Sequence, residues 1–244
     1  MIISSPLPFF NERKAGVDML VLHSMAHSAA VGLQHLQQYQ LSAHYVVDYD
    51  GTIYHCVDED KRAWHAGVSF WRGIEDVNSH SVGIEVCQRS LGQSRFNKRQ
   101  IAALIPLCRE IIQRHHIRPE MVVGHSDIAP QRKPDPGKCF PWAELAAANI
   151  GIWFGSRFAD ETDGVKMLSE IGYKTDTPAA AVAAAYAFCR RFLPQRIGRL
   201  PVLKLVEHPY DELAGEKMLR DKEFLAALQN ICLQYRCYGQ LSAA

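Results

Sequence analysis

Two histidines and one aspartate in this sequence have the residue types of a three-ligand zinc site. His23 ends an apolar run, and His125 and Asp135 both belong to the segment 125–137, whose prolines and glycine limit its shapes. Imidazole nitrogen and carboxylate oxygen bind Zn²⁺, and three protein ligands leave a fourth position for water. Such a set is typical of a catalytic zinc site rather than a closed structural one. The sequence therefore predicts a zinc hydrolase.

Glu85 is the candidate for moving a proton at this site. It lies in the middle of the apolar run of residues 81–87. If its carboxyl group is buried there, desolvation raises its pKa towards neutrality. A carboxyl group of that kind suits a general base that later acts as a general acid. The alternative is a solvated side chain on the polar face of a strand.

Three further side chains carry weaker signals. Lys133 lies two residues before Asp135, where its ammonium group would stabilise an oxyanion at the same centre, unless it is an ordinary solvated lysine. His44 and His65 lie in segments that we expect to line the cleft. Either histidine would hold substrate there, or would be a satisfied histidine at a strand edge. The sequence has no HExxH helix, no Gly-x-Ser-x-Gly turn and no Walker loop.

Short strands are expected to position these residues. The segment 42–57 predicts a hairpin around Asp50-Gly51. His23 and His125 follow predicted strand ends, where open sheets place their ligands. Apolar runs predict three buried strands, at residues 18–23, 81–87 and 121–124.

Two helices are expected in the same part of the chain. One covers residues 29–40. The other begins at Asn97, because Asn97 and Gln100 form a capping-box pattern and apolar residues then recur at helical spacing. Pro106 lies inside the second helix and is expected to kink it. Strands that alternate with helices up to about residue 150 predict an α/β domain with a central sheet.

The pattern changes after Gly155. Thr177 and Pro178 form a helix start, with proline at the first helical position. The stretch 193–217 is expected to be an irregular connection. Helices are predicted at residues 165–171, 177–192 and 221–235. We therefore predict two domains, a catalytic one over residues 1–155 and a small helical one over residues 156–244.

Composition limits the partners of the protein. A net charge of +1 over 244 residues gives no reason to expect nucleic acid or a membrane surface held by bulk charge. No stretch approaches the roughly 18 apolar residues of a membrane span. The beginning does not look like a cleaved leader, and seven scattered cysteines without a CxxC pair suit a reducing compartment. We expect a cytoplasmic protein, or a periplasmic one if a leader has been removed.

Ordered blocks over roughly residues 15–145 resemble the zinc-dependent N-acetylmuramoyl-L-alanine amidases of the AmpD and AmiD type. This superfamily also contains phage amidases and animal peptidoglycan recognition proteins. Several such blocks in the right order are a specific signal. The blocks are Leu-Val-Leu-His23-Ser, Ser-Ala-His44-Tyr, Asp50-Gly51, Ala-Trp-His65-Ala-Gly, Asn78 followed by Ser-Val-Gly-Ile-Glu85, and residues 125–137 followed by Phe140-Pro-Trp142.

The resemblance implies a role for each residue discussed above. His23, His125 and Asp135 would bind the zinc, Glu85 would be the catalytic acid and base, and Lys133 would stabilise the oxyanion. The implied fold is a mixed β-sheet flanked by helices, with zinc in a groove. The implied reaction cleaves the amide between the lactyl group of N-acetylmuramic acid and L-alanine of the peptidoglycan stem peptide. Five residues match segments that line the substrate groove: His44, Trp64, His65, Asn78 and Arg132.

Several alternatives remain at this point. The C-terminal helices resemble the three-helix peptidoglycan-binding module of AmiD-like members only loosely, because the Asp-Gly turn and the glutamine-rich helix of that module are missing. These helices either bind the cell wall or serve only as a packing partner. The substrate is either a 1,6-anhydro-muropeptide in recycling or intact wall outside the membrane. A non-catalytic peptidoglycan-binding protein and a hydrolase of another amide are the competing functions. Cobalt or manganese would also fit the ligand set.

Overall fold

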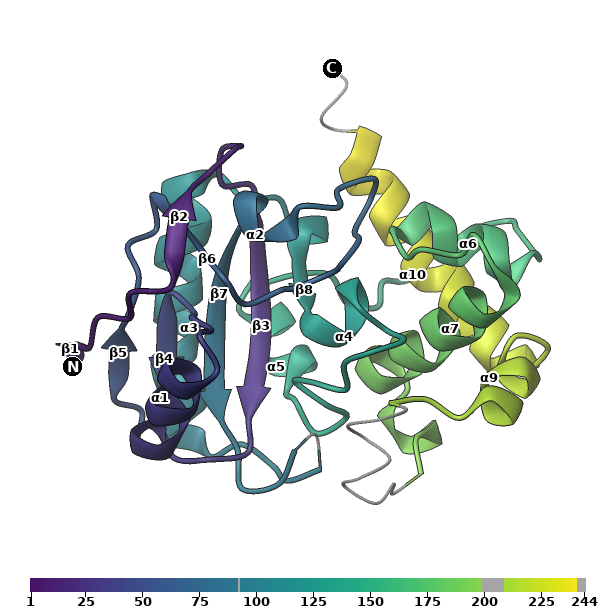
Figure 1. The fold of residues 1–244 in the computed structure, drawn as a ribbon. Coiled ribbons are helices and arrows are strands. Elements are labelled where there is room, and N and C mark those ends of the chain that lie inside the picture. The colour runs from purple at the N-terminus through teal and green to yellow at the C-terminus, as the bar shows by residue number, and fades with distance from the viewer. Residues whose placement is uncertain (92, 199–208, 241–244) are drawn as a thin grey trace.

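A six-stranded mixed sheet forms the centre of the computed structural model, which describes residues 1–91, 93–198 and 209–240. The strands lie in the order β1-β5-β4-β7-β3-β8 (Figure 1). Their bounds are β1 (Ile2–Ser4), β3 (Met19–Met25), β4 (Tyr45–Val47), β5 (Ile53–His55), β7 (Ser81–Cys87) and β8 (Val122–Gly124). A separate antiparallel pair is formed by β2 (Phe10–Glu12) and β6 (Lys61–Ala63).

Four neighbouring strands of the sheet, β4, β7, β3 and β8, run parallel to one another. The two longest, β3 and β7, are almost entirely buried, as expected for central parallel strands that are covered on both faces. Because parallel strands end at the same edge of a sheet, the residues near their carboxyl ends lie close together. Strand β5 runs antiparallel to β4, which makes the sheet mixed, as the family resemblance implied.

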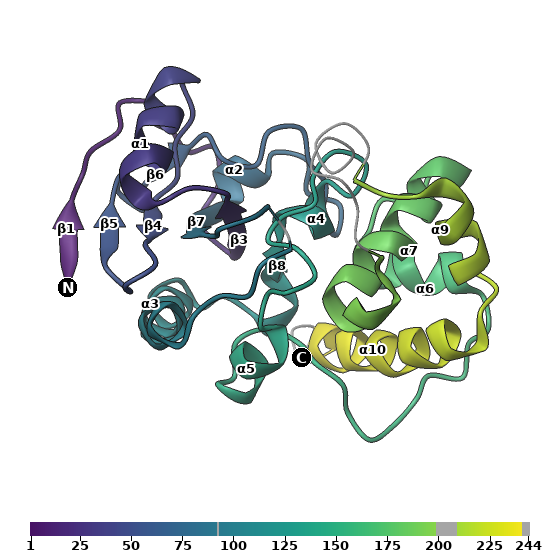
Figure 2. The same ribbon diagram turned by 90° about the horizontal axis from the view of Figure 1, so that it is seen from below.

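Helices cover both faces of the sheet. Figure 2 shows α1 on one face and α3 and α5 on the other. Helix α3 begins with the predicted capping box of Asn97 and Gln100, and it continues through Pro106. The bounds in this part are α1 (Ala29–Gln38), α2 (Val77–His80), α3 (Lys98–His115), the 3₁₀ turn η1 (Pro119–Met121), α4 (His125–Ile128) and α5 (Trp142–Ala147).

The predicted elements of this half are present, with two corrections. The hairpin around Asp50-Gly51 is formed by β4 and β5. The strand predicted to end at His23 continues to Met25, so His23 lies inside β3. The segment 125–137, predicted as one loop, begins with the short helix α4, because the side chain of Asp127 accepts a hydrogen bond from the Gly124 N–H and closes the first turn.

The C-terminal part is helical, as predicted, but contains a further helix. Thr177 caps α7 by accepting a hydrogen bond from the Ala180 N–H, and Pro178 is its first residue. The prediction of an irregular connection over 193–217 is wrong for α9 and for a 3₁₀ turn at Pro194–Arg196; residues 199–208 lie outside the described residues. Asp211 caps α9 through the Ala214 N–H. The helices are α6 (Gly164–Ile171), α7 (Pro178–Phe192), α9 (Glu212–Met218) and α10 (Lys222–Gln240).

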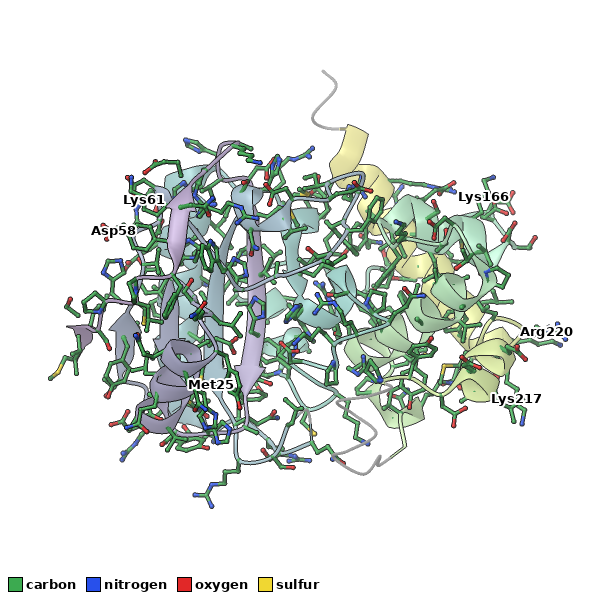
Figure 3. All side chains as sticks on the ribbon, in the orientation of Figure 1. Met25, Asp58, Lys61, Lys166, Lys217 and Arg220 are labelled. Atoms are coloured by element: carbon green, nitrogen blue, oxygen red, sulfur yellow. The ribbon has the colours of Figure 1, made fainter. Side chains whose placement is uncertain are left out.

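One hydrophobic core joins the sheet to the C-terminal helices. It contains Leu22 of β3 and Ile84 of β7, and also Phe188 of α7 and Tyr235 of α10. Lys166, Lys217 and Arg220 instead point outward from the helical part (Figure 3). The division of the chain at residue 155 stays a prediction. None of the helices that the structure describes is long and apolar enough to cross a membrane.

Candidate active site

Strand register brings His23 and Glu85 together. In the pairing of β3 with β7, His23 lies opposite Glu85, so both side chains leave the same face of the sheet. On the other side of β3, Leu22 pairs with Gly124, and His125 follows Gly124 directly. Three neighbouring parallel strands therefore deliver two imidazoles and a carboxylate to one place.

His23, His125 and Asp135 form the candidate metal centre. Their ligand atoms all lie within 4.8 Å of one another. His125 Nδ1 lies 2.9 Å from His23 Nδ1 and 3.1 Å from Asp135 Oδ2, and the distance from His23 Nδ1 to Asp135 Oδ2 is 3.4 Å. All three residues are buried. The structure thus brings together the three residues that the sequence singled out.

The hydrogen bonds around the two imidazoles indicate which nitrogens face the centre. His125 Nε2 lies 3.1 Å from the carbonyl oxygen of Ala66. Because a carbonyl oxygen only accepts hydrogen bonds, Nε2 carries the proton of the neutral ring and Nδ1 offers its lone pair. That lone pair faces His23 Nδ1 and a carboxylate oxygen. Two nitrogens and one oxygen that converge in this way fit a divalent cation, and the donor set is one that zinc prefers.

His65 supports His23 from behind. Its Nδ1 lies 2.9 Å from His23 Nε2, and its Nε2 lies 3.3 Å from the Ser81 hydroxyl oxygen. The Ser81 hydroxyl donates to the Val77 carbonyl oxygen at 2.6 Å, so it accepts the proton of His65 Nε2. His65 Nδ1 is then free to accept the proton of His23 Nε2, which leaves His23 Nδ1 for a metal. Partners of this kind orient metal ligands and fix their tautomer.

The protonation states of the ligands also suit a metal. Burial, together with the neighbouring His125, lowers the pKa of His23 to about 4, so that the ring is neutral near pH 7. Burial by itself would raise the pKa of Asp135, but contacts with His125 and His23 outweigh it and hold that pKa well below its ordinary value. Metals bind neutral imidazole and ionised carboxylate.

Glu85 lies beside the three ligands with one oxygen unused. Its Oε1 is 3.9 Å from His23 Nδ1, and its buried Oε2 has no hydrogen-bond partner within the described part of the chain. Burial and the charge of Asp135 raise the pKa of Glu85 to about 8, although Lys133 opposes the shift. A desolvated carboxyl group with a free oxygen is equipped to exchange a proton with a reacting molecule.

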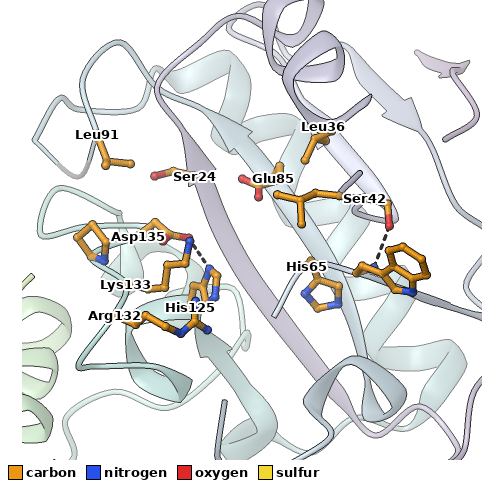
Figure 4. Close-up of a pocket in the computed structure, with 13 residues that line it drawn as sticks. Ser24, Leu36, Ser42, His65, Glu85, Leu91, His125, Arg132, Lys133 and Asp135 are labelled. Carbon is orange, nitrogen blue, oxygen red and sulfur yellow. Dashed lines mark hydrogen bonds and ion pairs between the residues drawn. The ribbon is translucent and has the colours of Figure 1, made fainter. Parts of the chain in front are cut away.

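His125, Asp135 and Glu85 line a pocket of about 190 Å³. Lys133 belongs to its wall together with Glu85 (Figure 4). Trp64 and Arg132 also line it; the Trp64 indole N–H donates to Asn11 Oδ1 at 2.8 Å, and Arg132 Nη2 donates to the Ala66 carbonyl oxygen at 2.8 Å. Four of the residues predicted around the metal ligands therefore meet at this pocket, as does His65.

Two predicted substrate contacts lie away from the pocket wall. His44 is fully buried, and its Nδ1 accepts a hydrogen bond from the Gly83 N–H at 2.9 Å. The side-chain oxygen of Asn78 accepts from the N–H groups of His65 and Ala66 at 3.1 and 2.8 Å. Both side chains hold the backbone behind the pocket. Direct contact with a substrate stays a prediction for both, and their positions do not favour it.

The structure also adds residues that the sequence did not single out. They lack the chemical signal of a titratable group, and they reach the pocket only through the fold: Ser24 follows His23 on β3, and Leu36 belongs to α1. Apolar spacing alone could assign Leu36 to a helix, but not to a pocket wall. The added lining residues are Ser24, Leu36, Leu41, Ser42, Leu91 and Pro134.

The site is typical of a mononuclear metallohydrolase. It combines an open sheet with two histidines, an aspartate and an adjacent glutamate. Comparison with known proteins narrows this class. The chain belongs to the N-acetylmuramoyl-L-alanine amidase family, whose model matches residues 12–138, about half of the chain. The matched region includes His23, Glu85, His125 and Asp135, and the family is the one that the ordered sequence blocks resemble.

Curated relatives agree with this assignment. The chain is 45% identical over 151 residues to the N-acetylmuramoyl-L-alanine amidase AmiD of Escherichia coli strain K12. The matched region covers 56% of this chain and 55% of that protein. It is 38% identical over 122 residues to the 1,6-anhydro-N-acetylmuramyl-L-alanine amidase AmpD of Enterobacter cloacae, covering 50% of this chain and 63% of that one. The chain thus spans between half and two thirds of the length of these relatives.

Solved structures match the fold over nearly the whole chain. AmiD from E. coli, in complex with the substrate anhydro-N-acetylmuramic acid-L-Ala-D-gamma-Glu-L-Lys, has a TM-score of 0.72 at 32% identity and covers 92% of this chain and 93% of that one. AmpDH3 from Pseudomonas aeruginosa, in complex with anhydromuramic pentapeptide, has a TM-score of 0.74 at 29% identity, with 91% and 94% covered. The C-terminal helices are therefore part of a shared architecture.

Proposed function

We propose that this protein is a zinc-dependent amidase that hydrolyses the bond between N-acetylmuramic acid and L-alanine of the peptidoglycan stem peptide. The observation that carries the proposal is the convergence of His23, His125 and Asp135 beside Glu85, whose Oε2 has no hydrogen-bond partner among the described residues. His125, Asp135 and Glu85 line one pocket. Membership of the amidase family supports this reaction. The relatives in complex with anhydro-muropeptides support a muropeptide as substrate.

The residues divide the chemistry among them. His23 Nδ1, His125 Nδ1 and Asp135 would hold zinc. When bound, zinc would act as a Lewis acid toward the amide carbonyl and a water molecule, and its charge would lower the pKa of Glu85. Glu85 accepts the proton of the attacking water at Oε2 and returns it to the nitrogen of the departing alanine. The ammonium group of Lys133 stabilises the negative charge on the carbonyl oxygen.

Side chains around the rim would position the substrate. Trp64 offers an aromatic surface to a sugar or a peptide, and Arg132 offers a cation on the side of Lys133. A muropeptide carries carboxylates along its stem, so a basic rim formed by Arg132 and Lys133 suits it. The small volume of the pocket, about 190 Å³, suits one bond and its neighbouring groups, with the rest of the substrate outside.

A direct test uses defined muramyl-peptides in their 1,6-anhydro and reduced forms. We expect the zinc-loaded protein to release free stem peptide, detected by mass spectrometry, and the ratio of the two rates to distinguish recycling from cleavage of wall material. A Glu85→Gln variant serves as the control for contaminating amidases. Release from neither form would overturn the proposal and favour a binding protein or an amidase of another substrate.

A further inference from the structure

The helix that carries His125 is bound directly to the C-terminal helices. Asp127, two residues after His125 in α4, accepts hydrogen bonds at both carboxylate oxygens. Arg191 Nη1 of α7 lies 2.9 Å from Asp127 Oδ2, and the Tyr173 hydroxyl lies 2.8 Å from Asp127 Oδ1. These three residues, at most 3% exposed, are sealed from solvent. The same Oδ2 accepts the Gly124 N–H at 2.8 Å.

Arg191 also contacts the elements on either side of α4. Its Nη2 lies 3.2 Å from the carbonyl oxygen of Val122 in β8, and its guanidinium carbon lies 4.0 Å from the centre of the Trp142 ring. One side chain of α7 thus contacts the strand before His125, the helix that His125 begins and an aromatic residue of α5. Charge-assisted hydrogen bonds of this kind are short and strongly directional. Figure 2 shows α4 between β8 and α7.

We propose that Tyr173 and Arg191 are positioning residues for the metal centre. Acting through Asp127, they fix α4 and thereby the position of His125 Nδ1 relative to His23 and Asp135. The C-terminal helices then serve the site whether or not they bind cell wall. The inference rests on the proposed function only in that His125 is a metal ligand.

A buried network of this kind can serve only to stabilise the fold. Here the geometry indicates that it also positions the metal ligands. The Asp127 carboxylate accepts a hydrogen bond from the backbone directly before His125, at the Gly124 N–H, and from two side chains of the C-terminal part, Tyr173 after α6 and Arg191 of α7. A backbone hydrogen bond also connects α4 to Asp135, because the Ser126 N–H donates to the Asp135 carbonyl oxygen at 2.7 Å. A shift of α4 therefore moves two ligands at once.

The matched comparison is Tyr173→Phe against Tyr235→Phe. Both tyrosines are fully buried in the same core and both face the Trp71 ring. The Tyr173 hydroxyl binds Asp127, whereas the Tyr235 hydroxyl has no hydrogen-bond partner among the described residues. Each variant removes one oxygen and keeps the ring. Arg191→Lys, which keeps the charge but not the forked geometry, is the stronger variant.

Two measurements on the full chain decide the matter. In the metal-free protein, amide hydrogen exchange of the peptide covering residues 122–137 should be on the order of tenfold faster in Tyr173→Phe than in the wild type, and unchanged in Tyr235→Phe. Zinc titration with a competing chelator should give a dissociation constant on the order of tenfold weaker for Tyr173→Phe, the effect expected when support of a metal ligand is lost. Arg191→Lys should weaken zinc binding more than Tyr173→Phe does.

Each result has a definite meaning. Equal exchange in the two tyrosine variants overturns the inference, and so does faster exchange with unchanged zinc affinity, because the network would then stabilise α4 without positioning His125. A wild-type protein that binds zinc but cleaves no muramyl-peptide removes the proposed function and leaves this comparison intact. A wild-type protein that binds no zinc removes the metal role of His125 and overturns both.

Discussion

Glu85 is the residue whose substitution separates chemistry from metal binding. Glu85→Gln keeps the size and removes the charge, so that no group of suitable basicity faces the substrate. We expect turnover to fall by about 10²–10⁴-fold. Zinc affinity should change little, because Glu85 is not among the three converging ligands. Steady-state kinetics with a chelator titration measures both, and turnover close to that of the wild type would contradict the assignment.

Glu85→Gln should also change the stability of the metal-free protein. Glu85 Oε2 is buried without a partner in the described part of the chain, and burial opposes ionisation of the carboxyl group. A neutral amide avoids that cost. We therefore expect the metal-free Glu85→Gln protein to melt at a higher temperature than the metal-free wild type. A lower melting temperature would mean that Glu85 has stabilising contacts that the structure does not contain.

His65 should affect zinc affinity more than substrate affinity. Because its Nδ1 accepts from His23 Nε2, His65→Ala leaves the His23 ring without an orienting partner, and we expect zinc binding to weaken about 10–100-fold. His65→Asn, whose side-chain oxygen can accept the same proton, should recover part of the loss. His80→Ala, outside the pocket, is the control. Unchanged zinc affinity in His65→Ala would leave His65 only its predicted role as a substrate contact.

At the scale of elements, the site depends on the register of β3 and β7 and on a glycine. A Cβ atom on Gly83 would lie 2.5 Å from Cγ of His65, so only glycine lets the His65 ring lie against β7. We expect Gly83→Ala to lower the free energy of unfolding by about 1–3 kcal/mol and to weaken zinc binding through His65. Urea unfolding measures the first effect. Gly16→Ala, where a Cβ atom meets nothing within 4 Å, is the matched control.

Glu59 joins the sheet to the end of α3 and should make stability depend on pH. Burial alone would raise its pKa, but hydrogen bonds from Tyr45, Arg114 and His115 outweigh it and lower the pKa below 4.5. The folded state therefore binds a proton less readily than the unfolded chain. The stability that Glu59 contributes is complete above the unfolded pKa and is lost as pH falls through the folded one.

The corresponding experiment compares urea unfolding at pH 7 and near pH 4. The loss of stability on acidification should be smaller in Glu59→Gln than in the wild type, because the variant has no carboxylate to protonate at this position. Glu75→Gln, at an exposed glutamate, should behave as the wild type does. Identical pH dependence in Glu59→Gln and the wild type would show that the contacts of Glu59 do not couple folding to protonation.

Much of this arrangement could be predicted from local sequence. Apolar runs located β3, β7 and β8, and capping residues located the starts of α3 and α7, because these signals act over a few residues. Helix α9 was missed because it is short and lies beside a long stretch without apolar periodicity. The support of α4 by Tyr173 and Arg191 could not be predicted, since their contacts with Asp127 span 46 and 64 residues and depend on tertiary packing.

At the scale of the whole molecule, the continuous core bears on the two predicted domains. Residues on both sides of position 155 share one hydrophobic cluster, and the ion pair between Arg191 and Asp127 is buried between them. Removing either partner of such a pair leaves an uncompensated buried charge. The two parts should therefore stabilise each other rather than fold independently.

This coupling predicts a single unfolding transition for the full chain. Far-ultraviolet circular dichroism reports mainly the helices. Tryptophan fluorescence reports the part of the chain before the C-terminal helices, because Trp64, Trp71, Trp142 and Trp153 all lie there. Thermal unfolding should give coincident transitions by the two methods. Zinc at a thousandfold excess over its dissociation constant should stabilise both signals together by about 4 kcal/mol, and chelation should reverse it. Two separate transitions, with only the fluorescence responding to zinc, would instead establish residues 1–155 and 156–244 as independent domains and would remove the physical basis for a metal site supported from the C-terminal helices.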